Sequence, residues 1–84
     1  MEVVELKGEI FDFMNETFLL EFNDNITEGT DLFKAGIIDS FGYLKLITFL
    51  ENEFHIKFSE DEILDNVFVS FSDIVNCISR KLYR

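Results

Sequence analysis

Residues 33–54 decide the fold, because they read FKAGIIDSFGYLKLITFLENEF and change character at Ser40. Before Ser40 the apolar residues have no regular spacing, whereas after it they recur every three or four positions. That spacing places them on one face of an α-helix. The stripe consists of Tyr43, Leu46, Ile47, Leu50 and Phe54. It predicts a helix from Ser40 to Glu53 or Phe54 whose stripe packs in the core.

Two longer segments on either side carry the same helical spacing. In residues 2–17 the stripe consists of Val3, Leu6, Ile10, Phe13 and Thr17, with Met14 beside it. In residues 71–83 it consists of Phe71, Ile74, Val75, Ile78 and Leu82. Ser70 and Asp73 also have the spacing of a capping box at the start of the last segment. We therefore expect two further amphipathic helices.

A shorter helix is indicated where the sequence reads SEDE. Ser59 and Glu62 have the spacing of a capping box, in which each residue satisfies a backbone N–H group near the other. The apolar side of this segment is supplied by Ile63, Leu64, Val67 and Phe68. We therefore expect a short helix between the two longer helices at residues 40–54 and 71–83.

Residues 18–39 form a long connection that is rich in Asn, Asp, Thr and Gly, the residue types of turns. We expect Ile26, Leu32 and Phe33 to pin it to the core. A short strand at residues 17–22 would have no partner for its backbone groups. The sequence therefore predicts an all-α fold in a single domain, residues 1–84. This domain is a small bundle of three main helices and one short helix.

The charge balance excludes some classes of function. The chain has 17 acidic and 7 basic residues, a net charge of −10, and 48% hydrophobic residues. We expect no nucleic-acid binding, because such binding depends on Lys and Arg at the phosphates. We also expect no membrane insertion, since the apolar runs are far shorter than ~20 residues, and no signal peptide. The acidity either serves encounters with basic protein patches or only keeps a Phe-rich domain in solution.

No arrangement of residues typical of an enzyme is visible, and we expect no catalytic activity. His55 stands alone near the end of the helix at residues 40–54, where we expect it to be solvent-exposed. Cys77 falls off the main stripe of the last helix, so we expect a partly buried thiol. A single cysteine also suits a reducing cytoplasm. The acidic groups at residues 51–53 and 60–62 lack the ligand spacing of a calcium loop.

Ser40 is the candidate functional residue, because the helix that it opens carries more apolar surface than a core needs. Phe41, Leu44 and Thr48 form a second stripe beside the core stripe. This docking strip either packs beneath the long loop or stays exposed. A helix N-terminus has free backbone N–H groups and the positive end of the helix dipole, so it accommodates a phosphate. Either Asp39 or Ser40 can cap the helix.

Residues 31–63 read DLFKAGIIDSFGYLKLITFLENEFHIKFSEDEI and resemble the carrier-protein family. This family includes acyl carrier proteins, D-alanyl carrier proteins and the carrier domains of nonribosomal synthetases. Its Gly-x-x-Asp-Ser hallmark matches residues 36–40, followed by Phe41. Its Leu-Phe pair before that turn matches Leu32 and Phe33, and LENEF matches the close of its long helix. The resemblance spans essentially the whole chain and implies the family's helical fold.

The resemblance also implies a function. Ser40, with Asp39 in the same motif, would be the attachment site of 4'-phosphopantetheine, delivered from coenzyme A by a phosphopantetheinyl transferase. The thiol of this arm would hold an acyl or aminoacyl cargo as a thioester. An adenylating or acyl-loading enzyme would load the cargo, and acyl- or aminoacyl-transfer enzymes would remove it. The expected docking residues are Phe41, Leu44, Lys45, Thr48 and Glu62. We expect a cytoplasmic monomer.

Two residues depart from the pattern of fatty-acid-synthase carriers. Those carriers have acids just after the serine, whereas this chain has Gly42 and Lys45. The stretch GIIDSFG is closer to the Gly-Leu-Leu-Asp-Ser-Met-Gly pattern of D-alanyl carriers, which predicts a stand-alone carrier in a specialised pathway. The identity of the cargo stays open. The alternative hypothesis is a carrier-like helical adaptor that binds partners without a prosthetic group.

Overall fold

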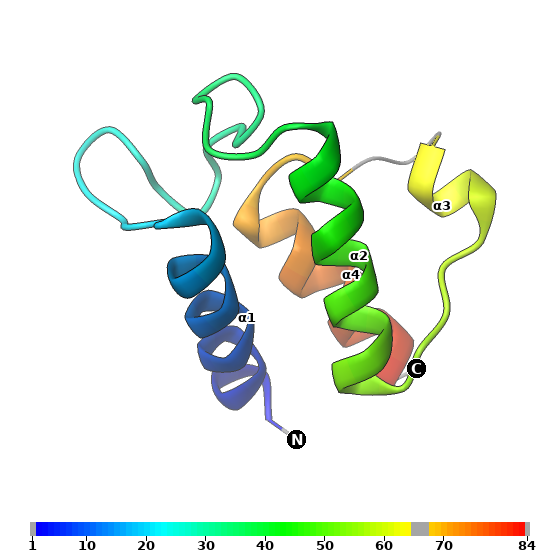
Figure 1. The fold of residues 1–84 in the computed structure, drawn as a ribbon. Helices are drawn as coiled ribbons and strands as arrows, with labels where there is room; N and C mark the ends of the chain where they lie inside the picture. The colour runs from blue at the N-terminus through cyan, green and yellow to red at the C-terminus, as the bar shows by residue number, and fades with distance from the viewer. Residues whose placement is uncertain (1, 65–67, 84) are drawn as a thin grey trace.

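The chain folds as four helices, with no strand, within residues 2–64 and 68–83, which are the residues that the computed structural model describes (Figure 1). The helices are α1 (Val3–Phe18), α2 (Ser40–Phe54), α3 (Glu60–Leu64) and α4 (Phe71–Tyr83). This confirms the predicted all-α fold of three main helices, one short helix and a long loop between the first two. Val67, expected on the apolar side of the short helix, lies outside the described residues.

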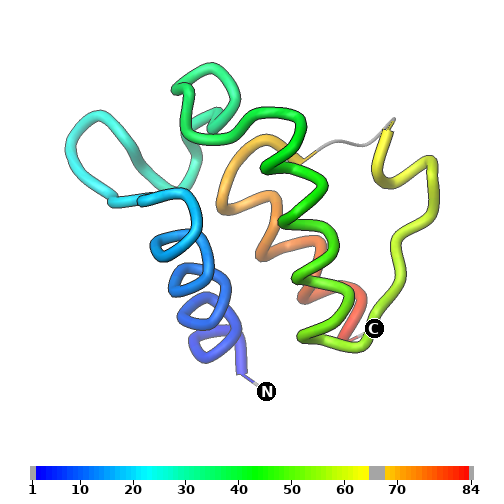
Figure 2. Tube along the Cα trace, in the orientation of Figure 1, coloured from blue at the N-terminus to red at the C-terminus, as the bar shows by residue number. Residues whose placement is uncertain are grey.

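The three longer helices form the body of the molecule. α1 packs against α4, and α2 passes in front of α4 in the view of Figure 1. α1 runs upward in this view, whereas α2 and α4 both run downward (Figure 2). The loop between α1 and α2 covers the end of the bundle at which α2 begins, and α3 stands to the side of that same end. Ser40 therefore lies at the end covered by the loop.

The core is built from the predicted stripes. All five stripe residues of α2 are buried, as are four from α4 and three from α1. The three from α1 are Leu6, Ile10 and Met14. Phe13 and Thr17 are only partly buried, as is Leu82 in α4. The prediction for Val3 was wrong: it is 46% exposed, because it opens the first turn of α1 and lies outside the buried core cluster.

The predicted capping box at α3 forms in full, whereas at α4 only the bond to the Ser70 hydroxyl forms as predicted. At α3, the Ser59 backbone N–H donates to Glu62 Oε1 at 2.9 Å, and the Glu62 N–H donates to Ser59 Oγ at 3.2 Å. At α4, the Asp73 N–H donates to Ser70 Oγ at 3.1 Å. The Asp73 carboxylate in turn accepts from the Val69 N–H at 3.3 Å. These bonds satisfy amide groups that would otherwise lack partners in the first turn of each helix.

The loop is fixed to the bundle by both apolar side chains and backbone. Leu20, Leu32 and Ile38 are buried, and the predicted anchors Ile26 and Phe33 are partly buried against the core. The Leu32 N–H donates to the Val69 carbonyl at 2.8 Å, just before α4. No strand forms at residues 17–22, because α1 continues to residue 18 and the next residue has a left-handed backbone. Within the described ranges, no helix is long and apolar enough to span a bilayer.

Candidate functional site

Asp39, not Ser40, caps α2. Asp39 has an extended backbone (φ −114°, ψ −173°), and its carboxylate accepts a 2.8 Å hydrogen bond from the Gly42 N–H. Ser40 is the first helical residue, and its side chain is exposed. Its hydroxyl takes part in none of the hydrogen bonds found among residues 2–64 and 68–83. The neighbour therefore does the capping, and the Ser40 hydroxyl stays available for chemistry.

A tight turn holds the chain just before Ser40. Gly36 has a positive φ of 78°, which glycine adopts without steric cost. After it, the backbone N–H groups of Ile37 and Ile38 both donate to the Leu32 carbonyl, at 3.0 and 3.2 Å. Ile38 is buried, two residues before Ser40. The serine is thus presented from an anchored turn and not from a free loop.

Gly42 allows the end of α1 to approach the start of α2. A Cβ atom at Gly42 would lie 2.9 Å from Cε1 of Phe18 and 3.3 Å from the capping oxygen of Asp39. Real Cβ contacts are almost never that short, so any side chain here would displace the Phe18 ring. The close approach of Phe18 therefore gives a packing reason for glycine at this position.

The docking strip is exposed and does not pack beneath the loop. Phe41 is 84% exposed and Leu44 is 54% exposed, although both follow directly after an anchored turn. Thr48 is also exposed, and its hydroxyl donates back to the Leu44 carbonyl at 3.0 Å. Lys45 is exposed beside the strip. Exposed large apolar side chains that lie together usually mark an interaction surface.

An apolar groove of about 320 Å3 opens beside Ser40. Its wall on one side is α2, and its wall on the other is α3. It is lined by Phe33, Ser40, Tyr43, Leu44, Ile63 and Leu64. The Tyr43 hydroxyl donates to the Ile63 carbonyl at 3.2 Å, which joins the two walls. Burial raises the pKa of the Tyr43 phenol above its ordinary value.

Sequence reasoning missed this Ser40 groove. It assigned Tyr43 to the core and Ile63 and Leu64 to the apolar side of the short helix. The short helix has no buried residue, and Leu64 is 70% exposed. The signal that could have revealed the groove is the apolar content of this helix, which is too short to bury what it carries.

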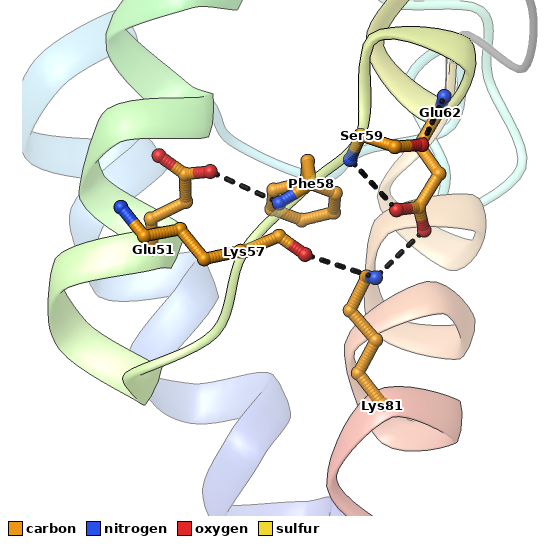
Figure 3. Close-up of polar contacts among 6 residues, drawn as sticks. All are labelled: Glu51, Lys57, Phe58, Ser59, Glu62 and Lys81. Carbon is orange, nitrogen blue, oxygen red and sulfur yellow. Dashed lines mark hydrogen bonds and ion pairs between the residues drawn. The ribbon is translucent and has the colours of Figure 1, made fainter.

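α3 is held in place by Lys81 of α4, as Figure 3 shows. The Lys81 ammonium donates to the Lys57 carbonyl at 3.1 Å and forms an ion pair with Glu62 Oε2 at 2.7 Å. It also lies 5.0 Å from the centroid of the Phe58 ring, within range of a cation–π interaction. The Phe58 N–H donates to the Glu51 carboxylate at 3.0 Å. A single ammonium therefore ties α4 to the chain on both sides of Ser59.

Glu62 was expected to dock partners, and its carboxylate already has partners within the chain. The hydrogen bond from Lys81 is the largest cause that lowers the pKa of Glu62, followed by the one from the Ser59 backbone. Its side chain is 34% exposed. A docking role at this position would therefore compete with the ion pair to Lys81.

The remaining candidate groups occupy the places expected from the sequence. His55 is exposed at the end of α2, with a left-handed backbone (φ 54°). Cys77 is partly buried, and burial raises the pKa of its thiol, which disfavours the reactive thiolate. In the described part of the chain, no three His, Cys, Asp or Glu side chains gather as metal ligands would.

Comparison with known proteins points in one direction. The chain is 39% identical to D-alanyl carrier proteins of Streptococcus sanguinis and Streptococcus gordonii over 54 residues, which are 64% of this chain and 66% of each relative. It is 40% identical to the D-alanyl carrier protein of Streptococcus mutans over 53 residues, 63% of this chain and 65% of the relative. The match thus spans just under two thirds of these relatives. No protein-family model matches the chain. The relatives support an acyl-carrier-protein-like family.

Proposed function

We propose that this chain, as a carrier of the acyl-carrier-protein-like family, holds an aminoacyl or acyl cargo on a 4'-phosphopantetheine arm attached to Ser40. One observation carries the proposal above the others. Ser40 is exposed and has no hydrogen bond to its hydroxyl in the described residues, although it opens a 15-residue helix that its neighbour caps. A hydroxyl in that position can be esterified without loss of any contact that stabilises the fold.

The start of α2 suits the phosphate of such an arm. The Ser40 and Phe41 N–H groups belong to the first turn and have no acceptor within the helix. They point with the positive end of the helix dipole toward the phosphate position. When attached, the arm supplies a terminal thiol that carries the cargo as a thioester. The Ser40 groove offers about 320 Å3 of mostly apolar space beside the attachment point.

Attachment requires a separate transferase. No base contacts the Ser40 hydroxyl among the described residues, since the adjacent Asp39 carboxylate accepts from the Gly42 N–H. We therefore assign removal of the hydroxyl proton to a phosphopantetheinyl transferase, with coenzyme A as donor. The loading and unloading enzymes would dock on Phe41 and Leu44, with Lys45, Thr48 and Glu62 around them.

The cargo that we propose first is D-alanine, loaded by an adenylating enzyme. The curated relatives are named D-alanyl carrier proteins, and GIIDSFG fits that pattern. Gly42 and Lys45 stand where fatty-acid-synthase carriers have acids. Lys45 is exposed and would repel the basic patches of enzymes that recognise those acids. A cytoplasmic monomer remains our prediction for the chain's state in the cell.

Intact mass spectrometry tests the proposal. The purified chain is incubated with coenzyme A and a permissive phosphopantetheinyl transferase, with Ser40→Ala as the control. We expect the mass of one phosphopantetheinyl group on the unaltered chain and none on the variant. A chain that gains nothing, or a variant that gains the same mass, would contradict the proposal. The modified chain is then offered D-alanine and L-alanine with a D-alanyl-type adenylating enzyme, and we expect the D-aminoacyl mass alone.

The exposed docking strip also favours a second candidate function, an adaptor without a prosthetic group. Phe41 and Leu44 can bind a partner whether or not an arm is attached. The adaptor hypothesis expects Ser40→Ala to keep partner binding and cellular function, while Phe41→Ala with Leu44→Ala abolishes both. The carrier hypothesis expects Ser40→Ala alone to abolish function.

A further inference from the structure

A second groove lies between α1 and α2, away from the Ser40 groove. It has a volume of about 280 Å3 and is lined by Glu9, Asp12, Phe13, Glu16, Phe49 and Glu53. The two rings form its apolar floor, stacked with centroids 3.8 Å apart and planes 11° apart. Both phenylalanines are only partly buried, and the four acidic residues around them are exposed. We call it the acidic groove, and its four carboxylates the rim.

The rim charges have no compensation within the described residues. The two ion pairs found there join Lys7 to Glu28 and Lys81 to Glu62, and neither includes a rim residue. Three of the rim acids follow one another along α1 at spacings of three and four residues, where like charges destabilise a helix. Of the cations near the rim residues in sequence, Lys7 pairs with Glu28, whereas Lys45 and Lys57 form no ion pair with the rim. The groove thus joins four carboxylates without ion-pair partners in the described residues to a partly exposed aromatic floor.

The acidic groove is separate from the attachment site. Phe49 follows Ser40 by nine residues of the same helix, which corresponds to about 180° around its axis and about 14 Å along it. The Ser40 groove is lined by α2 and α3, whereas the acidic groove is lined by α2 and α1. Figure 1 shows α1 and α3 on opposite sides of α2. A molecule bound in one can leave the other open.

We propose that the acidic groove docks a basic amphipathic segment of a partner protein. An apolar side chain of that segment covers the Phe13–Phe49 pair, and its Lys or Arg residues lie against the rim. Apolar contact at the centre with charged contact around it is the usual anatomy of a protein interface. A cation above an aromatic face is also attracted by the ring itself. Phosphate-bearing partners, such as nucleic acid or anionic lipid, are repelled by the same four carboxylates.

Binding of two synthetic peptides tests this docking. The probe is an amphipathic helix of Leu, Lys and Ala, and the control peptide has Glu in place of each Lys. Amide chemical shifts of the labelled chain locate the binding site, and fluorescence anisotropy gives the affinity. We expect the Lys peptide alone to bind and to shift the amides of α1 and of the second half of α2. Binding should weaken as salt rises from about 0.1 M to about 1 M, because the Debye length falls from ~10 to ~3 Å.

Matched variants separate the rim from the net charge. Glu9→Gln, Asp12→Asn and Glu16→Gln together remove three rim charges. The control variant, Glu21→Gln with Asp24→Asn and Glu60→Gln, removes three exposed charges elsewhere. We expect the rim variant to bind the Lys peptide about tenfold or more weakly, and the control variant within about twofold of the unaltered chain. Phe49→Leu should weaken binding several-fold and leave its salt dependence unchanged.

Other results would overturn the proposal. One such result is an equal loss of affinity for the Lys peptide in the two triple variants. Another is amide chemical-shift changes centred on the start of α2. A third is no binding of the Lys peptide at all. The tests do not use the arm, since the chain with Ser40→Ala is expected to bind the peptide as the unaltered chain does. Failure of this proposal therefore leaves the carrier function untouched, and the converse also holds.

Discussion

The two walls of the Ser40 groove are built in opposite ways. α2 has 15 residues, and five of them are buried, so the wall that carries Ser40 is fixed by the core. α3 has five residues and none is buried. It is held by hydrogen bonds and by the ion pair between Glu62 and Lys81. The proposed attachment point, Ser40, thus lies on the wall that the core fixes, and the facing wall depends mainly on polar contacts, with Ile63 only partly buried against the core.

The difference between the two walls predicts which of them would move if the volume of the groove changed. Displacement of α2 would expose buried apolar surface to water, with a free-energy cost of ~25 cal/mol for each Å2 exposed. Displacement of α3 breaks partly exposed polar contacts, each of which contributes about 1 kcal/mol or less. The groove should therefore widen by movement of α3, while the position of Ser40 stays constant. Four substitutions and one change of pH test this contrast.

The largest effect is expected from the buried side of α2. Leu46→Ala should lower the free energy of unfolding by about 2–5 kcal/mol, because Leu46 is fully buried and its truncation leaves a cavity. Leu44→Ala is the matched control, since Leu44 lies two residues earlier in the exposed strip. It should cost less than about 1 kcal/mol. Urea unfolding measures both, and equal losses would show that the two stripes of α2 are assigned wrongly.

The next effect concerns the cap of α2. Asp39→Ala should cost about 1 kcal/mol, because it leaves the Gly42 N–H without its acceptor. Asp39→Asn keeps an oxygen at the same place and should cost less. Thermal unfolding followed by circular dichroism distinguishes the two. A neutral Asp39→Ala would mean that another group caps the helix.

A smaller effect is expected on the side of α3. Lys81→Met should lower the free energy of unfolding by about 0.2–1 kcal/mol, since the ion pair is partly exposed. Hydrogen exchange should accelerate in α3 and stay unchanged in α2. Lys57→Met is the control, because the backbone carbonyl of Lys57 accepts from Lys81 whatever its side chain is. If hydrogen exchange in the Lys81→Met variant accelerated equally in α2, the two walls would not differ in the way proposed.

Lowering the pH should remove the stability that the ion pair between Glu62 and Lys81 contributes. The pKa of Glu62 is lowered in the folded chain, so its contribution is complete above the unfolded pKa of 4.5 and is lost as the pH falls through the lowered value. The difference in stability between the unaltered chain and Glu62→Gln should therefore be largest above that pH and shrink below it. Urea unfolding at several pH values measures this difference. A difference in stability that grows as the pH falls would contradict this prediction.

The smallest effect on stability is expected at Ser40, the proposed attachment residue. Ser40→Ala should change the free energy of unfolding by less than about 0.5 kcal/mol, because Asp39 provides the cap and the hydroxyl is exposed. The same variant should accept no phosphopantetheine. A loss of several kcal/mol would instead give Ser40 a structural role.

Local patterns in the sequence were sufficient for the helices and for the capping box of α3. The stripe of α2 and the Ser59–Glu62 capping box depend on residues within a few positions of one another, and both formed as predicted. The choice between Asp39 and Ser40 as the cap was not available from sequence, because both residue types cap helices well. Only the backbone angles of Asp39 decide it.

The features that could not be predicted from the sequence depend on contacts between residues that are far apart along the chain. The exposure of Phe41 depends on the path of the loop, which packs its own Leu20 and Leu32 elsewhere on the core. The ion pair between Glu62 and Lys81 joins residues 19 positions apart. The acidic groove likewise requires Glu53 of α2 to approach acids of α1. The spacing of apolar residues predicts the buried face of one helix at a time. It does not predict which residues of different helices contact one another.

The hydrogen bond from Tyr43 to the Ile63 carbonyl gives the molecule an intrinsic optical probe. The chain has two tyrosines and no tryptophan, so Tyr83→Phe leaves Tyr43 as the only tyrosine, whose emission is distinct from the weak emission of the phenylalanines. Its phenol spans the two walls of the groove, and widening of the groove breaks that bond. The emission of a single native residue can then report, in real time and without a dye, whether the hydrogen bond between the two walls is intact.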